Sequence, residues 1–140
     1  MVPIDCPFQV GLALVEKLRK QTPIILVDFH AELPQEKEAL GYYLDGKVSV
    51  VVGTHTHIQT ADERIMPKGT AYLSDLGMSG PLDGVIGSVP AIAIERQLTQ
   101  IPLRNEIFEG ASYLQGIVCT IDSDSGKAIS ITRINEQFGL

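Results

Sequence analysis

The chain of 140 residues has no tryptophan and only two cysteines, Cys6 and Cys119. This spacing makes neither a disulfide framework nor a metal-binding cysteine pair, so we expect two reduced thiols and a cytoplasmic protein. No apolar run approaches the roughly 20 residues of a membrane span, and the first residues lack a signal-peptide layout, so we expect no membrane association. Basic residues are the minority, with 11 Lys and Arg against 17 Asp and Glu. The net charge of −6 argues against broad DNA or RNA binding and leaves a small anionic substrate open.

Along the chain, segments with apolar residues at helical spacing alternate with short apolar runs typical of strands. This pattern is typical of one α/β domain. The segment "TPIILVDFH" is a continuous apolar run and predicts a strand buried on both faces. A helix and a second apolar strand follow within about 30 residues, which predicts a βαβ unit with parallel strands. The expected helices are 7–21, 33–46 and 88–100; the expected strands are 22–30, 48–53, 64–67 and 70–75, with a terminal hairpin of 112–122 and 127–134.

Histidine is scarce as well, and two of the three histidines stand in "GTHTH", directly after the second apolar strand. His30 ends the first of these strands, while His55 and His57 follow the second. Because ligand sites in parallel sheets lie at the carboxyl ends of the strands, all three histidines are expected at one edge. Neutral imidazole is the commonest metal ligand, so the pattern predicts a metal site. A purely structural cluster, or a pH-sensitive hydrogen-bond network, is the alternative.

A hydrolytic metal site usually includes carboxylates, and a two-metal site needs a bridging ligand. The carboxylates nearest the histidines in the sequence are Asp28, Glu32, Asp62 and Asp75, each of which also has an ordinary structural interpretation. The groups close enough in the sequence to contact a phosphate are Arg64, Lys68, Thr54 and Thr56, for which a solvated loop position is the alternative.

Other catalytic classes find little support in the sequence. The chain contains no G-x-G-x-x-G, no Walker loop and no G-x-S-x-G. An amidohydrolase also places H-x-H after a strand, but its barrel needs about 250 residues. The length of this chain therefore argues against an amidohydrolase.

The segments "DFHAE", "GTHTHIQTADERIMPKGTAYLSDLGMSGPLDGVIG" and "GKAISITRI" resemble the bacterial calcineurin-like metallophosphoesterases of the YmdB type, which are 2′,3′-cyclic-nucleotide 2′-phosphodiesterases. The resemblance implies a four-layer α/β/β/α sandwich around two divalent metal ions, iron or manganese. It implies that His30 and His55 bind one ion and His57 the other. The implied reaction is attack on phosphorus by a hydroxide that both ions activate, with a small phosphodiester or cyclic nucleotide as substrate.

The chain departs from the family in one respect, because the family's amino-terminal half has no counterpart in it. The motifs G-D, G-E-N and G-N-H of that half, with the bridging glutamate and the general-acid histidine, are absent. The resemblance therefore implies that residues 1–140 form a single partial metallophosphoesterase domain. It also implies that no catalytic residue other than metal ligands lies in this chain.

A half domain has consequences for partners and for activity. Alone it would expose an apolar sheet face, so we expect self-association or pairing with the missing half. The sequence thus predicts the histidine-bearing half of a metal-dependent cyclic-nucleotide phosphodiesterase. The alternative is a catalytically inactive α/β fragment or interaction module that retains the fold.

Overall fold

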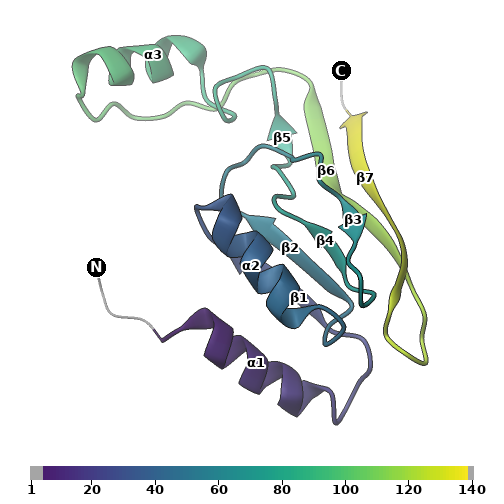
Figure 1. Ribbon diagram of the computed structural model, residues 1–140. Helices are drawn as coiled ribbons and strands as arrows, with labels where there is room; N and C mark the ends of the chain where they lie inside the picture. The colour runs from purple at the N-terminus through teal and green to yellow at the C-terminus, as the bar shows by residue number, and fades with distance from the viewer. Residues whose placement is uncertain (1–4, 139–140) are drawn as a thin grey trace.

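The computed structural model describes residues 5–138 and has a mixed α/β fold with two sheets (Figure 1). The expected succession of helices and strands is confirmed. The elements are α1 Pro7–Leu18, β1 Leu26–His30, α2 Pro34–Leu44, β2 Val50–Thr54, β3 Arg64–Ile65, β4 Ala71–Leu73, β5 Gly80–Pro81, α3 Pro90–Thr99, β6 Ser112–Ile121 and β7 Ala128–Phe138.

The first sheet has the strand order β1-β2-β4-β3. β1 and β2 are parallel and joined through α2, which confirms the βαβ unit. β2 and β4 are also parallel, whereas the short β3 runs antiparallel to β4. The register places His30 at the end of β1 opposite Thr54 at the end of β2, so the chain leaves both strands at the same edge.

The second sheet has the order β5-β6-β7 and is antiparallel throughout. Its main part is the expected terminal hairpin of β6 and β7, with β5 added at the edge of β6 from the glycine-rich segment.

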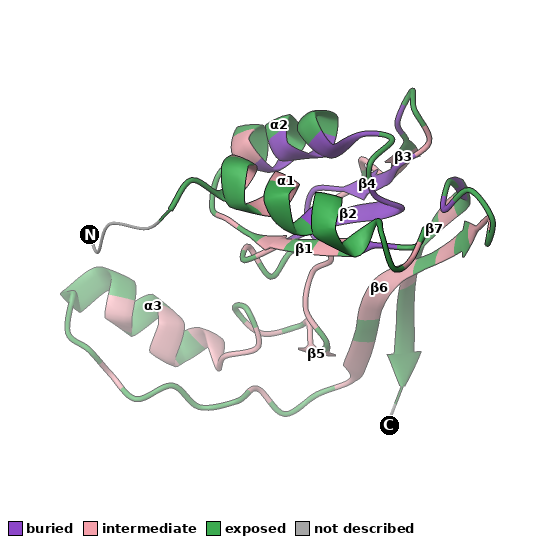
Figure 2. Cartoon of the chain, turned by 90° about the horizontal axis from the view of Figure 1, so that it is seen from below, coloured by how far each residue is buried: buried purple, intermediate pink, exposed green. Residues whose placement is uncertain are grey.

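Both faces of the central strand β2 are covered, and the alternation of its side chains divides the core accordingly. Val51 packs with the apolar sides of α1 and α2, whereas Val50 and Val52 pack against the β6–β7 hairpin. Figure 2 shows the buried residues concentrated between these layers. The described part of the chain is therefore a helical layer, a mostly parallel sheet and an antiparallel sheet.

The expectation that the first strand is buried on both faces is wrong. β1 is an edge strand whose residues alternate between exposed and half-buried. Val27 and Phe29 pack against the helical side, but Leu26 on the opposite face is 67% exposed because the hairpin lies over β2 and β4. The continuous apolar run thus identifies a strand with an open edge and one open face.

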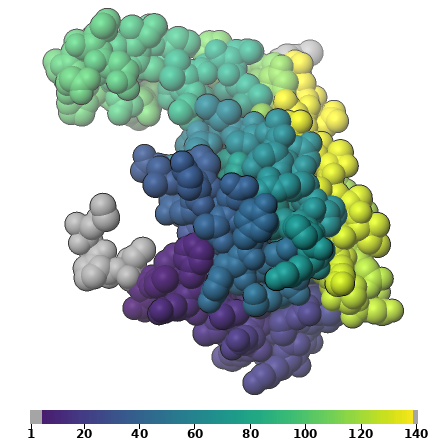
Figure 3. All heavy atoms as spheres, viewed as in Figure 1, coloured from purple at the N-terminus to yellow at the C-terminus, as the bar shows by residue number. Residues whose placement is uncertain are grey.

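Residues 82–111, which include α3, form an arm that extends from the two sheets (Figures 1 and 3). Of the ten residues of α3, none is buried. The arm is closed on itself by hydrogen bonds from the Val89 amide to the Glu106 carbonyl, 3.0 Å, and from the Phe108 amide to the Gly87 carbonyl, 2.9 Å.

Two features expected from the composition can be compared with the structure of residues 5–138. Cys6 and Cys119 are both free thiols, and burial raises the pKa of Cys119, which makes it a poor nucleophile. No helix in this part of the chain combines the length and apolar character that crossing a membrane requires.

Candidate functional site

Two histidines meet at the carboxyl edge of the parallel strands. Nδ1 of His55 lies 3.1 Å from Nε2 of His30, and the two rings pack edge to face with centroids 4.9 Å apart. The contact follows from the parallel register, because His30 ends β1 and His55 is the first residue after β2.

A short hydrogen-bond relay determines which nitrogen of His30 carries the proton. The Thr54 hydroxyl donates to Oδ1 of Asp28 at 2.9 Å, and its oxygen lies 3.1 Å from Nδ1 of His30. Because a threonine hydroxyl has only one hydrogen, His30 must donate from Nδ1 to the Thr54 oxygen. In the neutral imidazole, the other ring nitrogen, Nε2, then carries a lone pair that faces His55.

This pair of histidines fits a metal ion. A metal-ligating histidine usually donates its second ring N–H to a neighbouring acceptor, as His30 donates to Thr54. Two nitrogens bound at about 2.1 Å to one ion, roughly 90–110° apart, are separated by about 3.0–3.4 Å, and the observed separation of the facing nitrogens lies within this range. In residues 5–138, no cluster of three or more His, Cys, Asp or Glu side chains could hold an ion, so this chain offers two ligands at this point.

The H-x-H segment is tied down by a buried carboxylate. Asp75 accepts hydrogen bonds from the backbone amides of Thr56 and Gly77, both at 2.9 Å, and forms a 2.9 Å ion pair with Lys37. The side chains of Asp75 and Lys37 are 1% and 2% exposed. The Thr56 amide stands between His55 and His57, whose φ angles of 120° and 64° are rarely adopted by non-glycine residues. The Asp75–Thr56 bond therefore helps to hold an unfavourable backbone conformation that presents both histidines.

The charge of Asp75 is well stabilised in this position. Burial alone would raise its pKa, but the hydrogen bonds from Thr56, Gly77 and Lys37 outweigh burial, so that the pKa of Asp75 lies below its usual value. Asp75 is thus an anchoring carboxylate whose oxygens are already occupied. Nothing in its surroundings supports a role as a direct metal ligand.

The glycine of "GTHTH" has a steric explanation. A Cβ at Gly53 would lie 1.9 Å from the carbonyl oxygen of Ser74, and the Gly53 carbonyl accepts a 2.9 Å hydrogen bond from the Leu76 amide. Only glycine allows this approach between the ends of β2 and β4, which places Asp75 against the histidine segment.

His57 is not joined to the pair by a hydrogen bond or ring contact within the described residues. It lines a cavity of about 330 Å³ between the H-x-H segment and the arm. The cavity is also lined by Val85, Ile86, Ser88, Ala93, Arg96, Gln97 and Asn105. The three histidines thus lie at or just beyond the same edge of the sheet, and of the three only His57 lines this cavity.

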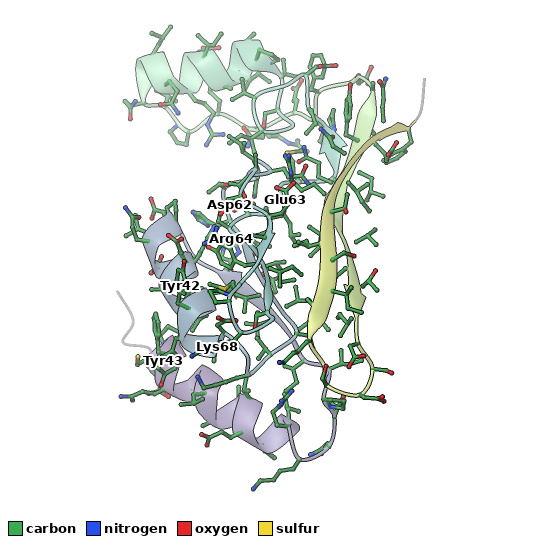
Figure 4. All side chains as sticks on the ribbon, turned by 45° about the vertical axis from the view of Figure 1, so that its right-hand side comes forward. Tyr42, Tyr43, Asp62, Glu63, Arg64 and Lys68 are labelled. Carbon is green, nitrogen blue, oxygen red and sulfur yellow. The ribbon has the colours of Figure 1, made fainter. Side chains whose placement is uncertain are left out.

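The remaining candidates from the sequence have other partners. Asp62 accepts hydrogen bonds from the Ser74 amide and hydroxyl, at 3.1 and 3.0 Å, and Glu32 is exposed. Arg64 pairs with Glu38 at 2.7 Å and lies over the ring of Tyr72. Its Nη1 also donates to the Asp62 carbonyl at 3.2 Å, and Figure 4 shows Arg64 and Asp62 next to each other. These contacts explain Asp62 and Arg64 without a ligand.

Further candidates are accounted for by local contacts. The Thr56 hydroxyl donates to the Ile58 carbonyl. The backbone amide of Lys68 donates to Asp45, and the Lys68 side chain is exposed, which is the solvated loop position given as the alternative. Thr54 contacts His30 rather than standing in an open phosphate site.

Sequence reasoning missed Lys37, although a signal was present. Lys37 lies on the same face of α2 as Leu40, Gly41 and Leu44, and all four are buried. A lysine on the apolar face of an amphipathic helix requires a buried carboxylate as partner. This requirement could have singled out Asp75, which the sequence suggested only as a turn residue or metal ligand.

Comparison with known proteins gives consistent matches over nearly the whole chain. A family model described as "YmdB-like protein" matches residues 1–134. A Bacillus subtilis protein named 2′,3′-cyclic-nucleotide 2′-phosphodiesterase is 51% identical over 132 residues, which cover 94% of this chain and 50% of that protein.

Two solved structures are similar in fold. A hypothetical protein from Thermus thermophilus superposes with a TM-score of 0.88 at 34% identity, covering 98% of this chain and 53% of the other. A novel phosphatase from Mycoplasma pneumoniae gives a TM-score of 0.87 at 35% identity, covering 98% and 49%. The chain spans about half the length of the curated relatives that it matches.

Proposed function

The chain belongs to the YmdB-like protein family, and on that premise we propose that it forms the histidine-bearing half of a metal-dependent phosphodiesterase. The proposed substrates are 2′,3′-cyclic nucleotides or similar small phosphodiesters, following the name of the Bacillus subtilis relative. The observation that carries the proposal is the approach of His30 Nε2 and His55 Nδ1 to 3.1 Å, with the His30 proton held on the opposite nitrogen.

The proposed cofactors are two divalent ions, iron or manganese. His30 and His55 would bind one ion, and His57 the other. When bound, such ions activate water and neutralise the charge on phosphate oxygens.

The chain's own residues would orient these ligands. Asp28 and Thr54 keep the proton of His30 on Nδ1 and so leave Nε2 available as a ligand. Asp75 and Lys37 hold the backbone from which His55 and His57 project. Metal ions bind an unprotonated imidazole nitrogen and compete with protons for it, so the affinity for metal should fall as the pH decreases.

The remaining ligands, the bridging carboxylate and a general acid are proposed to come from the half of the family domain that this chain does not match. The two halves together would form the four-layer sandwich. The open edge and exposed face of β1 offer a surface on which that half could continue the fold. Without it, self-association through this surface is expected.

A catalytically inactive α/β interaction module is the second candidate function. It is favoured by the absence of a three-ligand cluster in residues 5–138. In that case His30 and His55 form only an N–H···N hydrogen bond, and the protein binds no metal at this point.

Metal content separates the two functions. After loading with Mn²⁺ and dialysis, elemental analysis should find roughly one weakly held ion per parent chain, since two nitrogen ligands make an incomplete site. The variant His30→Ala/His55→Ala should lose this ion, whereas His57→Ala should retain it. Equal binding by the double variant and the parent would exclude the proposed ligands.

The hydrogen bonds that join Asp28, Thr54 and His30 can be tested in the metal-free protein. In Thr54→Val, ¹⁵N NMR of the imidazoles should show His30 no longer fixed in its Nδ1–H tautomer, and Mn²⁺ affinity should fall by about tenfold. Thr56→Val is the matched control because Thr56 lies on the same segment, and its hydroxyl bonds to the backbone of Ile58 rather than to His30.

A further inference from the structure

The cavity between the H-x-H segment and the arm has an unusual electrostatic composition for an acidic protein. None of the residues that line it is a carboxylate, although the chain has a net charge of −6. Its polar lining includes the guanidinium of Arg96 and the side-chain amides of Gln97 and Asn105. These groups are rich in N–H donors, and a donor-rich cavity with a cation suits an anionic ligand.

Arg96 has most of its hydrogen-bonding capacity available. Its Nη1 donates to Oδ1 of Asn105, and no ion pair within residues 5–138 involves Arg96. A guanidinium has five N–H donors in a planar fork that matches the oxygens of a phosphate. The bond to Asn105 leaves the other donors for a ligand and orients the Asn105 amide group with its N–H donors away from Arg96.

The walls of the cavity are held together by the arm itself. Arg96 lies in the last turn of α3, and the segment with Asn105 returns beside the start of that helix. The Glu106 carbonyl accepts a hydrogen bond from Val89, so Asn105 is fixed close to the segment that leads into α3. Arg96 and Asn105 therefore meet because of the arm's closed shape.

The apolar part of the lining indicates what accompanies the anion. Val85 and Ile86 line the cavity and are 46% and 52% exposed, so they offer apolar surface to a ligand. The volume of about 330 Å³ is at the lower end of the range for small-molecule sites, about 300–1,000 Å³. His57, the proposed ligand of the second ion, lies in the same lining.

We propose that this cavity binds the substrate's phosphodiester group, with Arg96 donating to a phosphate oxygen and Val85 and Ile86 contacting the nucleoside. The identification of the anion as substrate rests on the proposed function. The binding of an anion by Arg96 does not depend on it, because the lining contains its own cation and donors without a metal ion.

The test measures anion binding in metal-free protein. The 140-residue chain is dialysed against EDTA and titrated with inorganic phosphate and with 2′,3′-cyclic AMP, while ¹⁵N NMR follows the Arg96 Nε–H and the Asn105 amide. Both probes should bind saturably and shift these signals. Arg96→Gln should weaken binding by about tenfold or more, since a charge-assisted hydrogen bond is lost.

Two further variants separate binding from an effect on the arm's structure. Arg96→Lys retains the cation and should bind more tightly than Arg96→Gln. Arg104→Gln is the matched control on the same arm; Arg104 is exposed and does not line the cavity, so its variant should bind within about twofold of the parent. Equal affinities of Arg96→Gln and the parent, or no binding of either probe by the parent, would overturn the inference.

The two proposals can fail separately. If the chain binds Mn²⁺ through His30 and His55 but binds no anion, the proposed anion site is refuted and the proposed function stands. Anion binding that depends on Arg96, in a chain that binds no Mn²⁺, would support the cavity as an anion site while the metal-dependent function failed.

Discussion

The two sheets and the arm keep their structure by different means. In the sheets, Leu44 is fully buried, and the buried Asp75 carboxylate accepts hydrogen bonds from Lys37, Thr56 and Gly77. In the arm, Ile94 and Leu98 of α3 are 57% and 80% exposed, and backbone hydrogen bonds between neighbouring segments replace a core.

This difference divides the candidate site into a rigid part and an adaptable part. His55 and His57 lie on a segment that Asp75 holds through the Thr56 amide, as ligands with strict geometry require. Arg96 lies on the arm, where few buried contacts oppose a movement that would fit a ligand. The same cavity therefore joins a fixed wall at His57 to a movable wall at Arg96.

The largest effect should come from breaking the buried pair. Asp75→Ala leaves the Lys37 ammonium buried without a partner and should lower the free energy of unfolding by about 3–5 kcal/mol. Asp83→Ala, at an exposed position of the arm, should change it by less than about 0.5 kcal/mol. Urea unfolding followed by circular dichroism measures both. Similar losses in the two variants would contradict the distinction between the regions.

A pair of leucines tests the same distinction without charge. Leu44→Ala removes a side chain that is fully buried and should cost about 2–5 kcal/mol, whereas Leu98→Ala removes one that is 80% exposed and should cost little. The midpoint and slope of urea unfolding would be compared. A cost above about 1 kcal/mol for Leu98→Ala would show that α3 is covered in solution, for example by another copy of the chain.

The sequence was sufficient for the elements and for the position of the histidines. Apolar periodicity identified the βαβ unit, and parallel pairing places His30 and His55 at neighbouring strand ends. The sequence could not reveal that β1 is an edge strand. A continuous apolar run predicts a strand with two covered faces, and it does not show whether this chain supplies both covering layers.

Long-range polar partners were beyond the sequence as well. Lys37 and Asp75 are 38 residues apart, and only the packing of α2 on the sheet brings them together. The cavity residues Arg96 and Asn105 flank a turn whose path depends on backbone bonds rather than on an apolar pattern. Turn geometry of this kind has no periodic signal.

Acid provides a further way to weaken the sheets selectively. The pKa of Asp75 is lowered in the folded state, so its contribution to stability is present above the unfolded pKa of about 3.9 and is lost as the pH falls through the lower folded value. The parent should therefore lose more stability than Asp75→Asn between about pH 4 and pH 2. Urea unfolding at several pH values measures this slope.

Two surface carboxylates serve as controls for the acid experiment. Hydrogen bonds from Arg133 lower the pKa of Glu63, and those from Ser125 lower the pKa of Asp122. Both side chains are only half-buried, so Glu63→Gln and Asp122→Asn should retain most of the parent's acid dependence. If the free energy of unfolding of Asp75→Asn falls with decreasing pH as steeply as that of the parent, the acid sensitivity belongs to groups other than the buried pair.

The smallest expected effect concerns a polar atom in the core. The Tyr72 hydroxyl is buried and has no hydrogen-bond partner within residues 5–138, while Arg64 lies 4.7 Å from the centre of the ring. Tyr72→Phe removes the unsatisfied hydroxyl and retains the ring, so stability should stay equal or rise by up to about 1 kcal/mol. Tyr113→Phe loses an exposed hydrogen bond to Gln137 and should be nearly neutral. Destabilisation by Tyr72→Phe in urea unfolding would mean that the hydroxyl has a partner in solution, such as an ordered water, and that this part of the core is more polar than its side chains indicate.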